Sequence, residues 1–174
     1  IKSVRGSSAD ASVYYLAQML DAGEDIKFIA RRLIILASED IGLANPTALV
    51  IANNCFQAIQ TIGMPEARIV LSQCTIYLAT SPKSNSAYIA IDKALQYVRQ
   101  NPNLEVPLHL RNAPTKLMKQ LNYGKDYKYA HNYQGNFVKQ NYLPEKAKDE
   151  VFYIPSDNAK EKSIQEYLNK IQNQ

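Results

Sequence analysis

The chain has 174 residues, of which 46% are apolar and 21% charged, and its net charge is +4. This composition is typical of a globular domain, and it excludes a disordered chain, a collagen-like repeat and a disulfide-dense secreted module. No apolar run approaches the ~18 residues that a membrane-spanning helix needs, so none is predicted.

The chain begins at Ile1 rather than Met, and no charged start precedes an apolar stretch. We therefore expect no signal peptide and interpret the chain as a fragment of a longer protein. The two cysteines, Cys55 and Cys74, fall on apolar helix faces, which favours reduced core residues. The two histidines, His109 and His131, lack the spacing of zinc ligands.

Residues 1–100 have the apolar spacing of five consecutive helices. Ser7-Ser8-Ala9-Asp10 is interpreted as a capping box for the first helix, which ends near Gly23. Asp25 is expected to cap the second, whose apolar stripe runs from Ile26 to Ile41. Short connections between such helices predict neighbours in space and a core without a sheet.

The next three helices are separated by proline, glycine and serine. Asn45-Pro46 is expected to open the third helix, with Asn45 as its cap, and Gly63 to end it. The fourth begins after Pro65 and the fifth after Ser81–Ser84. The fifth is predicted to face inward through Ala87, Ile91, Ala94, Leu95 and Val98.

Two helices also carry apolar residues away from their main stripe. At 100° per residue, Phe28 and Ile35 lie roughly opposite Ile26 and Leu33. We call Phe28 and Ile35 the Phe28 seam. Ile69 and Ile76 are similarly displaced from the main stripe of the fourth helix, and we call them the Ile69 seam. Paired apolar residues of this kind indicate a second buried surface, covered either by another helix of this chain or by another subunit.

After residue 100 the chain becomes irregular. A short helix is predicted over residues 114–122, and residues 123–142 are poor in aliphatic side chains. Residues 151–154 are expected to be extended, and Asp157 is expected to cap a last helix.

No catalytic motif is found. The six glycines supply neither a phosphate-binding loop nor a nucleophile elbow. Ser81 with Lys83 fits a helix-capping loop better than a hydrolase pair. Glu39 and Asp40 are adjacent on a helix and do not face one another. We therefore expect no catalytic residue, no metal and no cofactor in this chain.

Residues 109–142 contain six cations and a single acid, Asp126, among aromatic side chains. Cations between aromatics are typical of surfaces that bind single-stranded nucleic acid, because cations contact phosphates and rings stack on bases. The alternative, a Tyr-rich loop packed on the helices, is favoured by the residues alone, since no nucleic-acid-binding motif is matched. The candidate DNA-binding residues are Arg111, Lys116, Lys119, Tyr123, Lys125, Tyr127, Lys128, Tyr129 and Lys139.

Several longer strings follow one another in a recognisable order. They are Ser3–Ser7, Ala30–Leu33, Ala37–Ala44, Ser81–Asn85, Pro107–Lys116, Tyr123–Tyr127 and Tyr142–Pro144. Together they resemble the C-terminal region of the RarA/MgsA replication-associated recombination proteins, bacterial relatives of the Werner-helicase-interacting ATPase. The resemblance covers almost the entire chain.

The resemblance implies an all-α, collar-like oligomerisation domain of an AAA+ ATPase related to clamp loaders. It implies a homotetramer that positions the ATPase on DNA at stalled forks, in replication, recombination and repair, with single-stranded-DNA-binding protein as a partner. ATP and Mg would bind the absent N-terminal module, and the location would be cytoplasmic and nucleoid-associated. A direct single-stranded-DNA-binding module and an adaptor for a replication protein remain the alternatives.

These observations predict an irregular array of about five to seven helices with a Tyr-rich C-terminal extension. Residues 1–122 are assigned to a helical oligomerisation core and 123–174 to an extension packed on it, within one structural domain. The family resemblance makes the two seams candidates for a subunit interface. The loop around His109, Arg111 and Asn112 is expected to have either a structural or a DNA-facing role. The interface candidates are Phe28, Arg31, Arg32, Ile35, Ile69 and Ile76.

Overall fold

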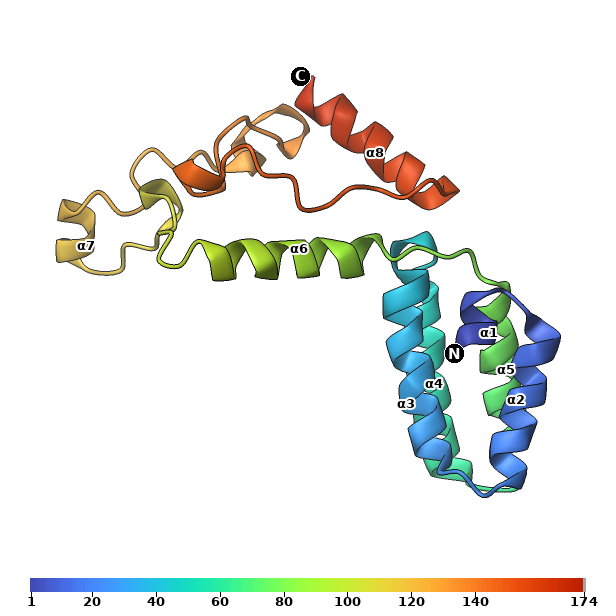
Figure 1. Ribbon diagram of the computed structural model, residues 1–174. Coiled ribbons are helices and arrows are strands. Elements are labelled where there is room, and N and C mark those ends of the chain that lie inside the picture. Colours follow the sequence, from blue (N-terminus) through green and yellow to red (C-terminus); the bar gives the residue numbers. More distant parts are fainter. Residues whose placement is uncertain (174) are drawn as a thin grey trace. The chain divides into compact units, whose positions relative to one another are not determined.

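The computed structural model describes residues 1–173, which are helical or irregular and contain no strand (Figure 1). This confirms the predicted all-α class. The last residue of the predicted extension, Gln174, lies outside the described residues. The chain forms two compact units: the first comprises Ile1–Ile91 and Tyr153–Ile164, and the second comprises Asp92–Phe152 and the residues from Gln165 onward.

Helix α5 is the centre of the first unit. It packs against α4 and α2, and also contacts α1 and α3; Figure 1 shows α2 beside α5 and α3 beside α4. The bounds of these helices are α1 Lys2–Arg5, α2 Ala9–Asp21, α3 Ile26–Leu36, α4 Thr47–Ile62 and α5 Ala67–Thr80. Small and branched residues on the inward face of α5, such as Ala67, Leu71 and Cys74, are at most 1% exposed. They let four neighbouring helices approach one axis.

The predicted helix ends are partly correct. Asp25 caps α3, because its carboxylate accepts the Lys27 N–H at 2.9 Å. The predicted capping box is wrong: Ser8 is the N-cap of α2 but its side chain makes no capping bond. Asn45 does not cap α4 either, because its amide donates to Tyr77 and Ser81 instead. Both cysteines are free and buried, as predicted.

The second predicted helix changes type before its end. The α-helical part stops at Leu36, and Ala37–Ile41 form a π-helical turn followed by a 3₁₀ turn over Gly42–Ala44. Gly42 has φ +46°, and a Cβ at this position would lie 3.0 Å from the Ser84 carbonyl oxygen. The turn lies against the 81–84 loop, since Ser84 N–H donates to the Asp40 carbonyl at 2.8 Å.

Helix α6 (Ser86–Gln100) contradicts the prediction for its inward face. Ile91, Leu95 and Val98 are 54%, 42% and 63% exposed. Its buried residue is instead Ser86, at the helix start. The amphipathic pattern is present, but no helix of the described chain covers it.

The second unit is mostly irregular. Its regular parts are the end of α6, the short helix α7 (Lys116–Gln120), four 3₁₀ turns and the end of α8 (Ala159–Gln172). The 3₁₀ turns are Leu108–Leu110, Ala130–Asn132, Gln134–Asn136 and Glu145–Ala147. Thr115 caps α7, accepting the Met118 N–H at 3.3 Å. The predicted cap Asp157 is wrong by one residue, because the Asn158 side chain accepts the Glu161 N–H.

Candidate functional site

A buried polar cluster within the first unit joins the start of α8 to the loop before α6. We call it the Glu161 cluster; its members are Ser84, Ser86, Tyr153, Ser156, Asn158 and Glu161. Glu161 is 0% exposed and accepts hydrogen bonds from Ser84 Oγ, Tyr153 Oη at 3.1 Å, Ser156 N at 2.9 Å and Asn158 Nδ2 at 2.9 Å. A carboxylate with this many donors is held in its charged form.

The electrostatics of Glu161 reflect two opposed causes. Burial raises the pKa of its carboxyl, but the hydrogen bonds from Ser84, Ser156 and Asn158 outweigh burial and lower that pKa to about 2. The group is therefore ionised at neutral pH, and it stabilises the fold instead of moving protons.

Further polar contacts connect this loop to the chain's beginning. Arg5 binds Asp40 through two hydrogen bonds of 2.5 and 3.2 Å. Lys83 Nζ donates to Ser7 Oγ at 3.0 Å and to the Ser81 carbonyl at 2.6 Å. Three of the strings behind the family resemblance, Ser3–Ser7, Ala37–Ala44 and Ser81–Asn85, thus meet in one place. Within residues 1–173 every buried side-chain nitrogen or oxygen is hydrogen-bonded, so this region is structural.

The two apolar seams lie on the surface of the first unit. Phe28 and Ile35 are 44% and 45% exposed, and Ile69 and Ile76 are 60% and 42% exposed. Within the described part of the first unit, no helix fully covers these four side chains.

One residue of each seam, Phe28 or Ile69, lines a cavity beside α2, and Leu16 of α2 lines both cavities. The Phe28 groove, about 180 Å³, is lined by Phe28 with Tyr15 and Met19. The Ile69 groove, about 510 Å³, is lined by Ile69 with Ala17 and Leu20. At 100° per residue these two pairs of α2 residues point to roughly opposite faces. The first unit therefore has two separate apolar surfaces.

The two arginines among the interface candidates, Arg31 and Arg32, have different surroundings. Arg32 lines the Phe28 groove. Arg31 is placed 3.6 Å from the Asp25 carboxylate in an exposed ion pair, which contributes little stability.

The Arg111 guanidinium makes its contacts with residues of its own loop. Its guanidinium donates to the Val106 carbonyl at 2.6 Å and to Glu105 at 2.6 Å, and lies over the Tyr123 ring at 5.1 Å. The hydrogen bond to Glu105 raises the pKa of Arg111, with a smaller contribution from Tyr123. These contacts favour the structural role for Arg111 and Tyr123.

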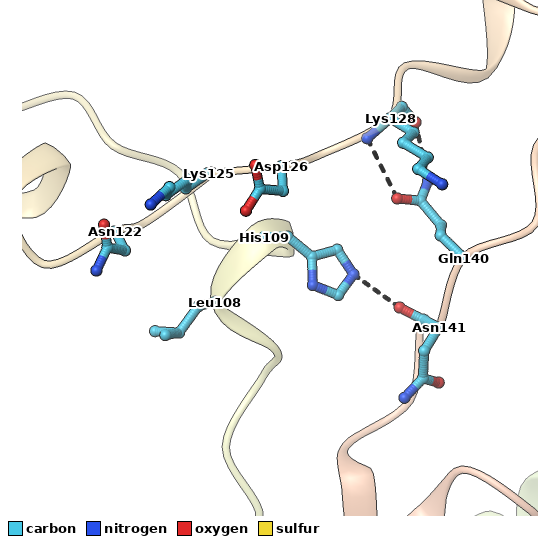
Figure 2. A pocket seen from close by; sticks show the side chains of 8 residues that line it. All are labelled: Leu108, His109, Asn122, Lys125, Asp126, Lys128, Gln140 and Asn141. Carbon is cyan, nitrogen blue, oxygen red and sulfur yellow. Dashed lines mark hydrogen bonds between the residues drawn. The ribbon is translucent and has the colours of Figure 1, made fainter.

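Two of the candidate lysines meet at one cavity of the second unit. We call it the Lys125 pocket; its volume is about 420 Å³, and it is lined by Leu108, His109, Asn122, Lys125, Asp126, Lys128, Gln140 and Asn141 (Figure 2). Lys125 and Lys128 both line it, together with Asp126. Sequence analysis did not single out Asn122, Gln140 or Asn141, which complete the lining.

The remaining cationic and aromatic candidates are dispersed. Lys116 and Lys119 lie on α7, and Lys139 lines a different cavity beside Tyr133. Tyr127 and Tyr129 are 46% and 54% exposed, and the Tyr129 ring lies 5.1 Å from the His131 ring. Lys139 therefore does not share the cavity that Lys125 and Lys128 line.

Neither unit shows metal-binding or membrane-spanning features. No group of three or more His, Cys, Asp or Glu side chains in the described part of the chain could hold a metal ion. None of the helices over residues 1–173 is both long enough and apolar enough to cross a bilayer.

Comparison with known proteins identifies one family. Residues 6–172 match the family model described as MgsA AAA+ ATPase C terminal. The chain is 45% identical over 168 residues to replication-associated recombination protein A of Coxiella burnetii, and 45% identical over 171 residues to the protein of that name from Bacillus subtilis. It is also 45% identical over 153 residues to ATPase WRNIP1 of Dictyostelium discoideum.

These alignments cover most of this chain and a smaller part of each relative. They include 96%, 98% and 87% of the chain, but 38%, 40% and 18% of the respective relatives. The chain therefore spans less than half the length of the curated relatives it matches.

Proposed function

Because the chain belongs to the family of MgsA AAA+ ATPase C-terminal regions, as its motifs predicted, we propose that it is the collar-like domain through which copies of a replication-associated AAA+ ATPase assemble. Catalysis would reside in the part of the protein outside this chain, where ATP and Mg would bind. The chain's own contribution would be to hold several ATPase modules in a fixed arrangement.

The exposed apolar seams carry this proposal. Four large apolar side chains, each between 42% and 60% exposed, lie at regular helical spacing on one unit. Large apolar side chains exposed in this way on each of two surfaces mark association sites in a folded domain. A second copy of the chain is the occupant that the family's relation to multi-subunit ATPases favours.

The number of surfaces bears on the number of copies. One self-complementary patch closes a dimer and leaves no further surface. Two distinct surfaces, the Phe28 groove and the Ile69 groove, allow a tetramer, either by two different two-fold interfaces or by head-to-tail closure. We therefore propose a homotetramer.

Paired charge substitutions at each seam test the proposal. We expect Phe28→Asp with Ile35→Asp, and separately Ile69→Asp with Ile76→Asp, to lower the mass measured by sedimentation equilibrium at micromolar concentration. Two-fold interfaces predict a dimer from each variant, and head-to-tail closure predicts a monomer from each. Either result supports assembly through these seams.

The matched control adds two charges elsewhere on the same unit. Gln57 and Gln60 are exposed on α4, so Gln57→Asp with Gln60→Asp should leave the mass unchanged. Circular dichroism of each variant should retain its helical signal. Unchanged mass in both seam variants, or unfolding of both, would contradict the proposal.

A second candidate function is direct contact with single-stranded DNA. It is favoured by the unpaired lysines and exposed tyrosines of the second unit. In the assembled protein such contacts would help position the ATPase at stalled forks, with single-stranded-DNA-binding protein as a partner in a nucleoid-associated setting. An adaptor for another replication protein is the third candidate.

A further inference from the structure

The two cysteines of the chain lie at the same level in two neighbouring helices. Residues 63–66 are a short connection between α4 and α5, so these two helices in contact form an antiparallel pair. Cys55 lies seven residues before Ile62, the last residue of α4, and Cys74 lies seven residues after Ala67, the first residue of α5. At about 1.5 Å per residue, both cysteines are about 10 Å from the connection.

Both cysteines also lie on the packed faces of their helices. Cys55 is 4% exposed and Cys74 is 1% exposed. The Cys55 thiol donates a long hydrogen bond to the Val70 carbonyl oxygen, which lies 3.8 Å from Sγ. Val70 is one turn before Cys74, and helical side chains lean toward the preceding turn. The Cys55 sulfur therefore lies beside the turn that the Cys74 side chain covers.

The spacing of packed helices suits a covalent bond at this level. Each Cα lies about 2.3 Å from its helix axis, so helices with axes about 8 to 10 Å apart bring facing Cα atoms to roughly 4 to 6 Å. A disulfide forms without backbone movement when the two Cα atoms are about 4.4 to 6.8 Å apart. Ala52, one turn before Cys55 and 0% exposed, is a small residue that allows α5 to approach α4 closely.

The two thiols are not equivalent. A hydrogen bond with Cys74 lowers the pKa of Cys55, although burial opposes this change. The same hydrogen bond, together with burial, raises the pKa of Cys74. The thiolate is the nucleophilic form of cysteine, so Cys55 is the thiol that reacts first and Cys74 is the one that follows.

From this geometry we propose that Cys55 and Cys74 form a redox site, at which a disulfide oxidant links α4 to α5 through an intramolecular disulfide. The Cys55 thiolate attacks one sulfur of the oxidant, whose S–S bond breaks and releases a thiolate. Cys74 gives its proton to this thiolate and attacks the Cys55 sulfur, which releases the second half of the oxidant. That half takes up the proton that Cys55 lost, so the products are one protein disulfide and two small thiols.

Burial determines which oxidants react at this site. Neither sulfur is open to a bulky molecule, so the oxidant must be small and must enter when the helix pair opens locally. The disulfide closes a loop of about 20 residues, which constrains the unfolded chain. The oxidised chain is therefore expected to be more stable than the reduced chain.

Treatment of the folded, full chain with hydroxyethyl disulfide, a small disulfide oxidant, tests the proposal. The chain has two cysteines, so the thiols counted after denaturation should fall from two to none. The mass of the chain should fall by that of two hydrogen atoms, and digestion without reductant should recover the Cys55 and Cys74 peptides as a linked pair. The midpoint of urea unfolding should rise by about 1 M and return when dithiothreitol is added.

Single variants test the order of attack. Cys74→Ala should stop at a mixed disulfide, with one half of the oxidant attached to Cys55. Cys55→Ala should react at least about tenfold more slowly, because the remaining thiol is the less acidic one. The matched control, Cys55→Ala with Cys74→Ala, should keep its helical circular dichroism and show no change of urea midpoint with the oxidant.

Three results would overturn the proposal. Thiols that resist the oxidant in the folded chain, but react once urea unfolds it, would show that the pair is only part of the core. A doubled mass in denaturant without reductant would show a bond between two chains instead of within one. Equal reaction rates of the two single variants would remove Cys55 as the attacking group. None of these results bears on the assembly proposal, because neither cysteine belongs to a seam.

Discussion

Glu161 shows how one buried side chain organises a region of the first unit. It accepts hydrogen bonds from Ser84, Tyr153, Ser156 and Asn158, and no cation is among these partners. Removing the charge leaves donors without an acceptor, which costs more than losing an exposed contact.

We expect Glu161→Gln to lower the free energy of unfolding by about 3 kcal/mol, because an amide replaces one acceptor oxygen with a donor. Urea unfolding followed by circular dichroism measures this change. Ser163→Ala, at an exposed position two residues on, is the control and should differ by less than about 0.5 kcal/mol. A Glu161→Gln protein as stable as the unmodified chain would contradict this account.

The same residue predicts a dependence on pH. The pKa of Glu161 is lowered from 4.5 to about 2 in the fold, so its stabilising contribution is complete above pH 4.5. It is lost as the pH falls from there toward 2, because protonation then favours the unfolded chain. The stability difference between the unmodified chain and Glu161→Gln should therefore shrink across that window, and a constant difference would argue against it.

Gly42 provides a second test at the residue scale. Its φ of +46° is unfavourable for any side chain, and a Cβ would approach the Ser84 carbonyl to 3.0 Å. We expect Gly42→Ala to destabilise by about 1 to 3 kcal/mol. At Gly23, φ is +79° but a Cβ would meet no atom within 4 Å. Gly23→Ala therefore measures the backbone strain alone, and it should lower the free energy of unfolding by less than Gly42→Ala does. Equal costs would show that the contact with the 81–84 loop is unimportant.

At the scale of the element, α5 and α6 both carry apolar residues at helical spacing but differ in packing. Leu71 on α5 is 0% exposed, whereas Val98 on α6 is 63% exposed. We expect Leu71→Ala to lower the free energy of unfolding by about 3 kcal/mol through lost burial and a residual cavity. Val98→Ala should stay within about 0.5 kcal/mol in the isolated, dilute chain. A large loss for Val98→Ala would mean that α6 is covered.

This contrast explains which elements could be predicted. The apolar spacing predicted helices in the places where α2 to α6 are found, since periodicity depends only on local sequence. It could not show that Ile91, Leu95 and Val98 stay exposed, because what covers a helix depends on distant parts of the chain. Asn158 and Glu161 have the spacing of a capping pair. This local signal identifies Asn158 as the cap of α8, whereas the prediction placed the cap at Asp157.

At the scale of the whole molecule, the candidate sites depend on contacts that no local pattern encodes. The Phe28 and Ile69 seams could be recognised from helical geometry alone. The Lys125 pocket could not, because its lining comes from three separate segments, which the bonds of His109 to Asn141 and of Gln140 to Lys128 join. The cations of residues 109–142 indicated single-stranded nucleic acid as a ligand class. They did not indicate that Lys125 and Lys128 line the same pocket.

The family and the two surfaces support one proposal: this chain would assemble through apolar side chains that a single copy leaves exposed. Hydrophobic burial is the main driving force for such association. Apart from Leu16, the two grooves are lined by different residues of α2, so assembly need not stop at two copies.

The mass of the unmodified chain in solution tests this claim most directly. Sedimentation equilibrium at micromolar concentration should give about four times the 19.6 kDa of one chain. A species that remains at 19.6 kDa across that concentration range would contradict it.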